Sequence, residues 1–277
     1  MKKLGMNWIQ HGLCLALSLI MFTASGVRAN NVQVSTVTLT GQNAASQYTN
    51  IQFNLSWENS WRDAAAPSPT DNWDAVWVFA KVSDAPGLWK HATLSTNAAD
   101  HNGQGYTVTP SPDGKGVFIH RAAGGQGNVS LTNVLLRWNY GSDVITSGAN
   151  VTVRVFAVEM VYVPQGAFFV GDGTTTALQG QFIQGGTTNP FQITSEAALT
   201  LGGTAATNLA SQTGSYNDDF TSAVTKTLPD AYPKGFNAFY CMKYEVSQQQ
   251  YADFRNTLTL TQSNANNTGT SGGRPNP

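Results

Sequence analysis

The sequence is poor in cysteine, in charge and in long apolar runs, and each shortage excludes a class of protein. Only two cysteines occur in 277 residues, and Cys14 lies in an N-terminal apolar stretch, so Cys241 has no partner beyond it. A lone thiol forms no internal disulfide and no thiolate metal cluster. Only 11% of the residues are charged, and no apolar run reaches the ~20 residues that cross a bilayer as a helix. An apolar core must therefore hold the fold.

Residues 1–29 have the pattern of a secretory signal peptide. Two lysines precede an apolar stretch at 13–22, and small residues at Val27 and Ala29 fit cleavage after Ala29. A retained N-terminal anchor is the alternative, but the apolar stretch is about half the length that spans a bilayer. The sequence therefore predicts an exported protein that is periplasmic, cell-surface or extracellular.

The charge that remains after the signal peptide indicates which partners to expect. After removal of the predicted signal peptide, the chain has 12 basic and 16 acidic residues and a net charge of −4. Such a surface does not attract nucleic acid or anionic lipid. We therefore expect no nucleic-acid partner and no transmembrane span. The sequence leaves the partner open, with a glycan or a surface protein as the two candidates.

Residues 30–157 show the alternation of β-strands and are predicted to form a β-sandwich domain. The apolar positions of one such strand are Ile51, Phe53, Leu55 and Trp57. Their period of two indicates a half-buried strand. The segment WDAVWVFAKVS (73–83) is almost continuously apolar and indicates a central strand. Short strands separated by Gly-rich turns, with no helical period, favour a sandwich or barrel.

The second region, 158–277, begins with two short apolar runs, MVYV and AFFV. Pro164 fixes φ and Gly166 allows a positive φ, so the sequence predicts a hairpin that turns at 164–166. A Gly-, Thr- and Asn-rich stretch follows, and then AFYCMKYEV predicts a strand. In SQQQYADFRNTLT, Ser247 and Gln250 form a capping-box pattern that predicts a helix. The apolar face of this helix comprises Tyr251, Phe254 and Leu258.

Two stretches of this second region carry motifs in a fixed order: MVYVPQGAFFVGD at 160–172 and FYCMKYEVSQQQYADF at 239–254. They resemble the first two signatures of the formylglycine-generating enzyme family, the sulfatase-modifying factors. The main matching residues are Met160, Pro164, Gly166, Phe168, Gly171, Glu245, Tyr251 and Phe254. The resemblance implies an α+β, C-type-lectin-like domain in which these residues are scaffold. Region 158–277 would be its N-terminal part, and the chain a fragment of a longer product.

The resemblance also implies a chemistry that this chain lacks. Family members oxidise a cysteine of a sulfatase peptide with oxygen, using a copper-binding cysteine pair and nearby calcium ions. Here Cys241 stands alone in a predicted strand, where we expect it to be a small buried residue. We therefore assign no catalytic, metal or cofactor-binding residue and predict no formylglycine formation by this chain. Copper and calcium are implied only if a missing C-terminal part supplies their ligands.

The histidines and tryptophans of the first region are the remaining candidates. His91, His101 and His120 have no spacing typical of a metal site and are interpreted as surface or loop residues. Trp57 and Trp77 belong to apolar strand positions and should lie in the core. Trp61 and Trp73 flank the 62–72 loop and are candidate platforms for stacking on a glycan. A secreted or surface binding module for glycan or protein is therefore the alternative function.

Overall fold

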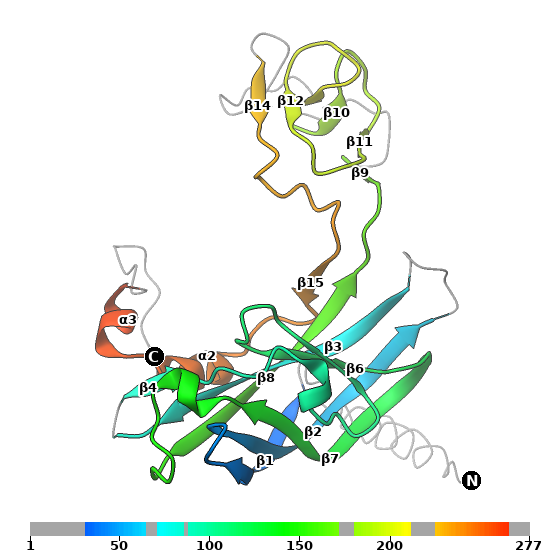
Figure 1. Cartoon of the computed structure of the whole chain (residues 1–277). Helices are drawn as coiled ribbons and strands as arrows, with labels where there is room; N and C mark the ends of the chain where they lie inside the picture. The colour runs from blue at the N-terminus through cyan, green and yellow to red at the C-terminus, as the bar shows by residue number, and fades with distance from the viewer. Residues whose placement is uncertain (1–30, 65–70, 86–87, 172–179, 212–224, 266–277) are drawn as a thin grey trace, which may run out of the picture.

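A computed structural model of the chain describes residues 31–64, 71–85, 88–171, 180–211 and 225–265. The predicted signal peptide lies outside these ranges. Within them the chain is mainly β, with antiparallel sheets and few helical residues (Figure 1). The prediction of a mainly-β fold with a sandwich-like body is confirmed.

The sandwich-like body contains eight of the described strands. They are β1 (Gln33–Asn43), β2 (Tyr48–Asp63), β3 (Asn72–Ser83), β4 (Trp89–His91), β5 (Thr107–Pro110), β6 (Val117–His120), β7 (Gly125–Trp138) and β8 (Thr152–Val163). Two short 3-10 helices, η1 (Ala98–Asp100) and η2 (Tyr140–Asp143), connect them. β2 pairs with β1 and β7, whereas β3 pairs with β8 on one side and with β4 and β6 on the other. β5 extends the second group by pairing with β6.

The core lies between these two groups of strands. All four predicted inward positions of β2 are at most 1% exposed: Ile51, Phe53, Leu55 and Trp57. They pack in one cluster with alternate residues of β3, including Val76 and Val78. Burial of each such side chain contributes about 1.5–3 kcal/mol. The predictions of a half-buried strand and a central strand are therefore confirmed, whereas Trp77 is half-buried and lies outside the core.

β8 continues without interruption across positions 157 and 158, where the sequence suggests a boundary. Its second half pairs with β3 on one side and with β15 (Phe239–Met242) on the other. The predicted hairpin at 164–166 is wrong, because β9 (Phe168–Val170) pairs with β11 (Phe191–Ile193) instead. β15 occupies the edge of β8 that such a hairpin would need, and Gly166 does not have a positive φ.

A small lobe projects from the sandwich in Figure 1. Besides β9 and β11, the lobe contains β10 (Phe182–Gln184), β12 (Leu199–Leu201), β13 (Leu209–Ser211) and β14 (Lys226–Leu228). Phe191, Ile193 and Leu209 form its small core. Gly171 has a φ of +117°, and a Cβ there would lie 2.6 Å from the carbonyl oxygen of Phe182. A glycine is therefore required where the chain enters the lobe, as the sequence indicates.

Two short helices follow β15: α2 (Gln248–Arg255) and α3 (Leu260–Ala265). Ser247 and Gln250 form the predicted capping box at the start of α2. Of the predicted apolar face, Phe254 packs edge-on against Phe79 and Phe156 of the sandwich. Tyr251 is 53% exposed. The helix therefore packs on the sheet through one aromatic side chain and leaves another open to solvent.

Candidate binding groove

The outer face of β3 carries aromatic side chains because residues alternate between the two faces of a strand. The inward residues of β3 fill the core, so the odd-numbered residues point outward, among them Trp73, Trp77 and Phe79. In the antiparallel ladder Trp77 lies opposite Phe118 of β6, and Phe79 lies opposite Phe156 of β8. Directly opposed residues share a face. The sheet therefore presents an outer layer of aromatic rings.

A groove with a volume of about 800 Å³ begins at one end of this layer. It runs between β1, β8 and α2. Its apolar walls include Val32, Val34, Val37, Phe79, Val153, Val155, Phe156, Val158, Val246, Tyr251 and Phe254. The volume and the largely apolar lining match those of small-ligand sites in proteins, which measure about 300–1,000 Å³. We treat this groove, hereafter the α2 groove, as the candidate functional site.

Aromatic rings from three elements meet in the α2 groove. The rings of Phe79 and Phe156 stack with centroids 5.1 Å apart and planes 11° apart. Phe254 of α2 stands edge-on to both, at 6.1 Å and 6.2 Å. Both arrangements are favourable for aromatic pairs. This cluster fixes the position of α2 on the sheet and leaves the exposed ring of Tyr251 at the mouth of the groove.

Polar groups line the rim of the α2 groove. Arg154 comes from β8, and Asp253 and Asn256 come from the α2 side. Among the described strands, none pairs with the outer edge of β8 before Met160, because β15 pairs only with its last four residues. Backbone amides and carbonyls at such an edge are available to a ligand. The groove thus combines aromatic walls with hydrogen-bonding groups.

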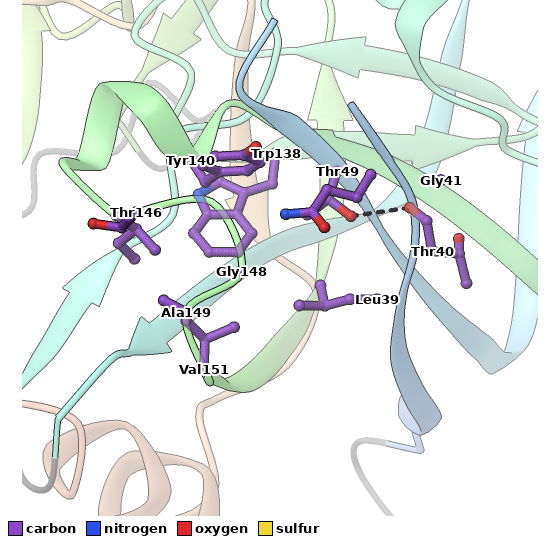
Figure 2. Close-up of a pocket in the computed structure, with 12 residues that line it drawn as sticks. Leu39, Thr40, Gly41, Thr49, Trp138, Tyr140, Thr146, Gly148, Ala149 and Val151 are labelled. Carbon is purple, nitrogen blue, oxygen red and sulfur yellow. Dashed lines mark hydrogen bonds between the residues drawn. The ribbon is translucent and has the colours of Figure 1, made fainter. Parts of the chain in front are cut away.

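A second pocket, of about 360 Å³, lies at the other end of β1 (Figure 2). Trp138 and Tyr140 line it together with Thr49, and it contains no charged residue. The polar atoms of these three residues bond within the protein: Thr49 donates to the carbonyl of Thr40 at 3.0 Å, and Trp138 Nε1 donates to Asp143 at 2.6 Å. Tyr140 donates to the carbonyl of Asn43 at 3.3 Å. Because these groups are occupied, we interpret this pocket as a consequence of packing.

A buried ionic cluster joins the segment after β15 to the sandwich. Lys243 Nζ lies 3.1 Å from Asp74 Oδ2 and 3.3 Å from Glu159 Oε2. The two acids are 0% and 2% exposed. Asp74 also accepts hydrogen bonds from Ser60 Oγ at 2.8 Å, the Trp61 amide at 2.9 Å and Trp57 Nε1 at 3.1 Å.

The electrostatics of this cluster indicate a structural role. Burial raises the pKa of Glu159, and the ammonium of Lys243 only partly opposes that shift. Burial alone would lower the pKa of Lys243, but the carboxylates of Asp74 and Glu159 outweigh it and raise the pKa. Asp74 and Lys243 each have several partners, and none of the three residues lines the α2 groove. The cluster therefore holds the chain after β15 against the sandwich.

The two tryptophans proposed as glycan platforms do not share a face. Trp61 and Arg62 are neighbours on β2, and it is Arg62 that pairs with Trp73. The ring of Trp73 stacks on Tyr162 with centroids 4.0 Å apart and lies 4.9 Å from the ring of His120. Its Nε1 donates to the hydroxyl of Tyr240 at 3.2 Å. Trp73 therefore belongs to a half-buried aromatic stack on the outer face, whereas Trp61 is half-buried elsewhere on the surface.

The motif residues fall at several places in the structure. Met160 lies in β8, Pro164 and Gly166 follow that strand, and Phe168 lies in β9. Glu245 is exposed and precedes the helix cap, so it is not in the first turn of α2. Of the eight matching residues named above, Tyr251 and Phe254 line the α2 groove. From the sequence, these two residues are interpreted as scaffold and no role is given to Phe79, whose outward phase on β3 was the available signal for its place in the groove.

Cys241 is exposed, which corrects the expectation of a buried thiol. It lies opposite Val161 at the edge of the sheet, where β15 has no further neighbour among the described strands. No second cysteine lies in the described ranges, so the residues present do not fit a copper–thiolate pair. In the same ranges no group of three or more His, Cys, Asp or Glu side chains could hold a metal ion.

The three histidines are more enclosed than the sequence suggested. His120 is 5% exposed, and His91 and His101 are half-buried. His101 Nδ1 accepts a hydrogen bond from the Arg137 amide at 3.2 Å, so Nε2 carries the proton that it shares with the carbonyl of Ser95. Protonation of Nδ1 would break the bond from the amide. The pKa of each of these histidines is lowered, and burial is the largest cause in every case.

We expect the free energy of unfolding to fall as the pH drops below 6.5. The unfolded chain binds protons at His91, His101 and His120 before the folded chain does, because the folded pKa values are lower. This stabilisation is complete above 6.5 and is lost as the pH falls through the folded values. Urea unfolding from about pH 8 to pH 5.5 would measure it. The pH dependence should be weaker in His101→Gln, and an identical dependence in the variant would contradict the assignment to His101.

The comparisons with known proteins add no identification. No protein-family model matches the chain, and no curated protein or solved structure matches it either. Within the described ranges, no helix is both long and apolar enough to cross a membrane.

Proposed function

We propose that the chain is an exported, non-catalytic binding protein that takes a glycan in the α2 groove. The observation that carries the proposal is the meeting of Phe79, Phe156, Phe254 and the exposed Tyr251 around a space of about 800 Å³. Aromatic rings provide apolar faces for the C–H side of a sugar ring, and a polar rim can bond its hydroxyl groups. The predicted signal peptide supports an exported location.

The family resemblance remains part of this proposal because of one structural relation. The strand segments of its two motifs lie side by side, with Met160 opposite Met242 and Val163 opposite Phe239. Motifs of a single structural unit should lie together, although about 80 residues separate the members of each pair in the sequence. We infer a relation to the sulfatase-modifying-factor scaffold, used here for binding.

We expect Tyr251→Ala to weaken glycan binding by about tenfold or more, since loss of a stacking ring removes at least ~1.4 kcal/mol of binding free energy. Tyr251 is 53% exposed, so the variant should fold normally. A glycan array probed with the full chain would identify ligands, and isothermal titration calorimetry would compare the variants. Trp61→Ala is the matched control, because Trp61 lies outside the groove.

Three results would decide between this site and others. Loss of binding in Trp61→Ala but not in Tyr251→Ala would place the site at the platform suggested by the sequence. Binding of extended peptides instead of glycans would point to strand addition at the open edge of β8. A folded protein that binds no glycan on the array would contradict the proposed function.

A further inference from the structure

A row of basic side chains crosses the sheet beside the α2 groove. Lys81 of β3 lies opposite His91 of β4 on one side and opposite Arg154 of β8 on the other. Directly opposed residues share a face, so all three point outward. Lys115 joins them from the loop before β6, where its carbonyl oxygen is hydrogen-bonded to His91 Nε2. Basic groups from four separate segments therefore meet on one part of the outer face.

The positive charge of this row is not compensated within the described part of the chain. Lys81, Lys115 and Arg154 form none of the ion pairs found there. Lys81 is only 7% exposed, its ammonium has no hydrogen-bond partner among the described residues, and it lies 5.7 Å from the ring centroid of Phe254. Burial lowers the pKa of Lys81, and the neighbouring Lys115 lowers it further.

The acids near the row are already engaged elsewhere. Asp84 pairs with Lys90 at 3.1 Å. Asp143 accepts hydrogen bonds from the side chains of Thr93 and Trp138. Asp253 of α2 accepts a hydrogen bond from Gln249 at 2.8 Å and forms no ion pair with Arg154. Like charges opposed across neighbouring strands lower stability. An arrangement of this kind is suited to a ligand that brings the missing negative charge.

We propose that Lys81, Lys115 and Arg154 form a subsite for the carboxylate or sulfate group of an acidic saccharide bound in the α2 groove. The inference rests on the proposed function and adds the class of ligand. Arg154 itself lines the groove, and its guanidinium lies 4.8 Å from the ring centroid of Trp89, which fixes it at the rim. A guanidinium binds a carboxylate or sulfate through two parallel hydrogen bonds. Lys81 lies directly opposite Arg154 on β3 and adds a second positive charge.

Calorimetric titration of the full chain would compare a uronic-acid-containing oligosaccharide with a neutral oligosaccharide of the same length. We expect the acidic sugar to bind about tenfold more tightly at low salt, and the preference to shrink at high salt because ions screen it. Equal affinities for the two sugars would overturn the acidic subsite and leave the proposed function standing. Binding of neither sugar, nor of any glycan on the array, would instead contradict the proposed function.

Two substitutions test the subsite against a purely structural role for the basic row. Arg154→Gln should weaken binding of the acidic sugar by about tenfold. Lys81→Met should remove the preference for the acidic sugar and raise the melting temperature of the free protein, because it relieves the repulsion between Lys81 and the opposed Arg154. A structural lysine would give the opposite change in melting temperature.

Lys90→Met is the matched control, since Lys90 lies next to His91 on β4 but pairs with Asp84. It should leave the preference for the acidic sugar intact. Inorganic sulfate serves as a second probe that needs no sugar. Sulfate binding that disappears in Lys81→Met and Arg154→Gln would support the subsite. Sulfate binding and sugar preference that persist in both variants would show that anions bind elsewhere and would overturn it.

Discussion

Lys243→Met is expected to destabilise the fold by about 3–5 kcal/mol, because it leaves two buried carboxylates without their counter-charge. Lys243 lies within 3.3 Å of both Asp74 and Glu159, and these acids are almost fully buried. Urea unfolding followed by circular dichroism would measure the change in the free energy of unfolding. The loss should include detachment of the segment after β15, which Lys243 holds to the sandwich.

Two further variants make this prediction specific. Lys226→Met removes a lysine from an exposed position on β14 and should change stability by no more than about 0.5 kcal/mol. Glu159→Gln combined with Lys243→Met should recover part of the loss, because it removes one of the two uncompensated charges. A Lys243→Met variant as stable as the original chain would show that the cluster does not hold the fold together.

Trp57→Ala is expected to cost about 3–5 kcal/mol, the range for loss of a large buried aromatic side chain. Trp57 is 1% exposed, packs edge-on against Tyr106 at 5.9 Å and donates a hydrogen bond to the buried Asp74. Trp57→Phe keeps most of the apolar contact but removes that donor, so we expect a smaller loss of about 1.5–3 kcal/mol. Thermal and urea unfolding of both variants would measure the two contributions.

The control for these variants is Trp61→Phe. The side chain of Trp61 is half-buried, and its link to Asp74 comes from the backbone amide, which the substitution keeps. We expect a change of less than about 1 kcal/mol. A loss in Trp61→Phe as large as that in Trp57→Ala would contradict the assignment of Trp57 to the core.

The groove shows how little of the candidate site the sequence could reveal. Tyr251 and Phe254 were recognised as one face of a helix, but nothing local indicated what that face would meet. Their neighbours Phe79 and Phe156 lie about a hundred residues or more earlier in the chain. The outer aromatic layer also argues against Trp73 as a glycan platform, because its ring stacks on Tyr162 and its Nε1 donates to Tyr240. A bound sugar would need those same contacts.

The sequence by itself determined the local features of this protein. Alternation placed Ile51 and Phe53 in the core, and the spacing of Ser247 and Gln250 set the start of α2, because faces and caps depend on neighbouring residues. Only the tertiary structure decided which strands pair. β15 takes the end of β8 that a hairpin would have used, and Lys243 reaches Asp74 across 169 residues. Such contacts depend on which strand edges and which buried charges still lack a partner when the rest of the chain has folded. A local sequence pattern does not contain that information.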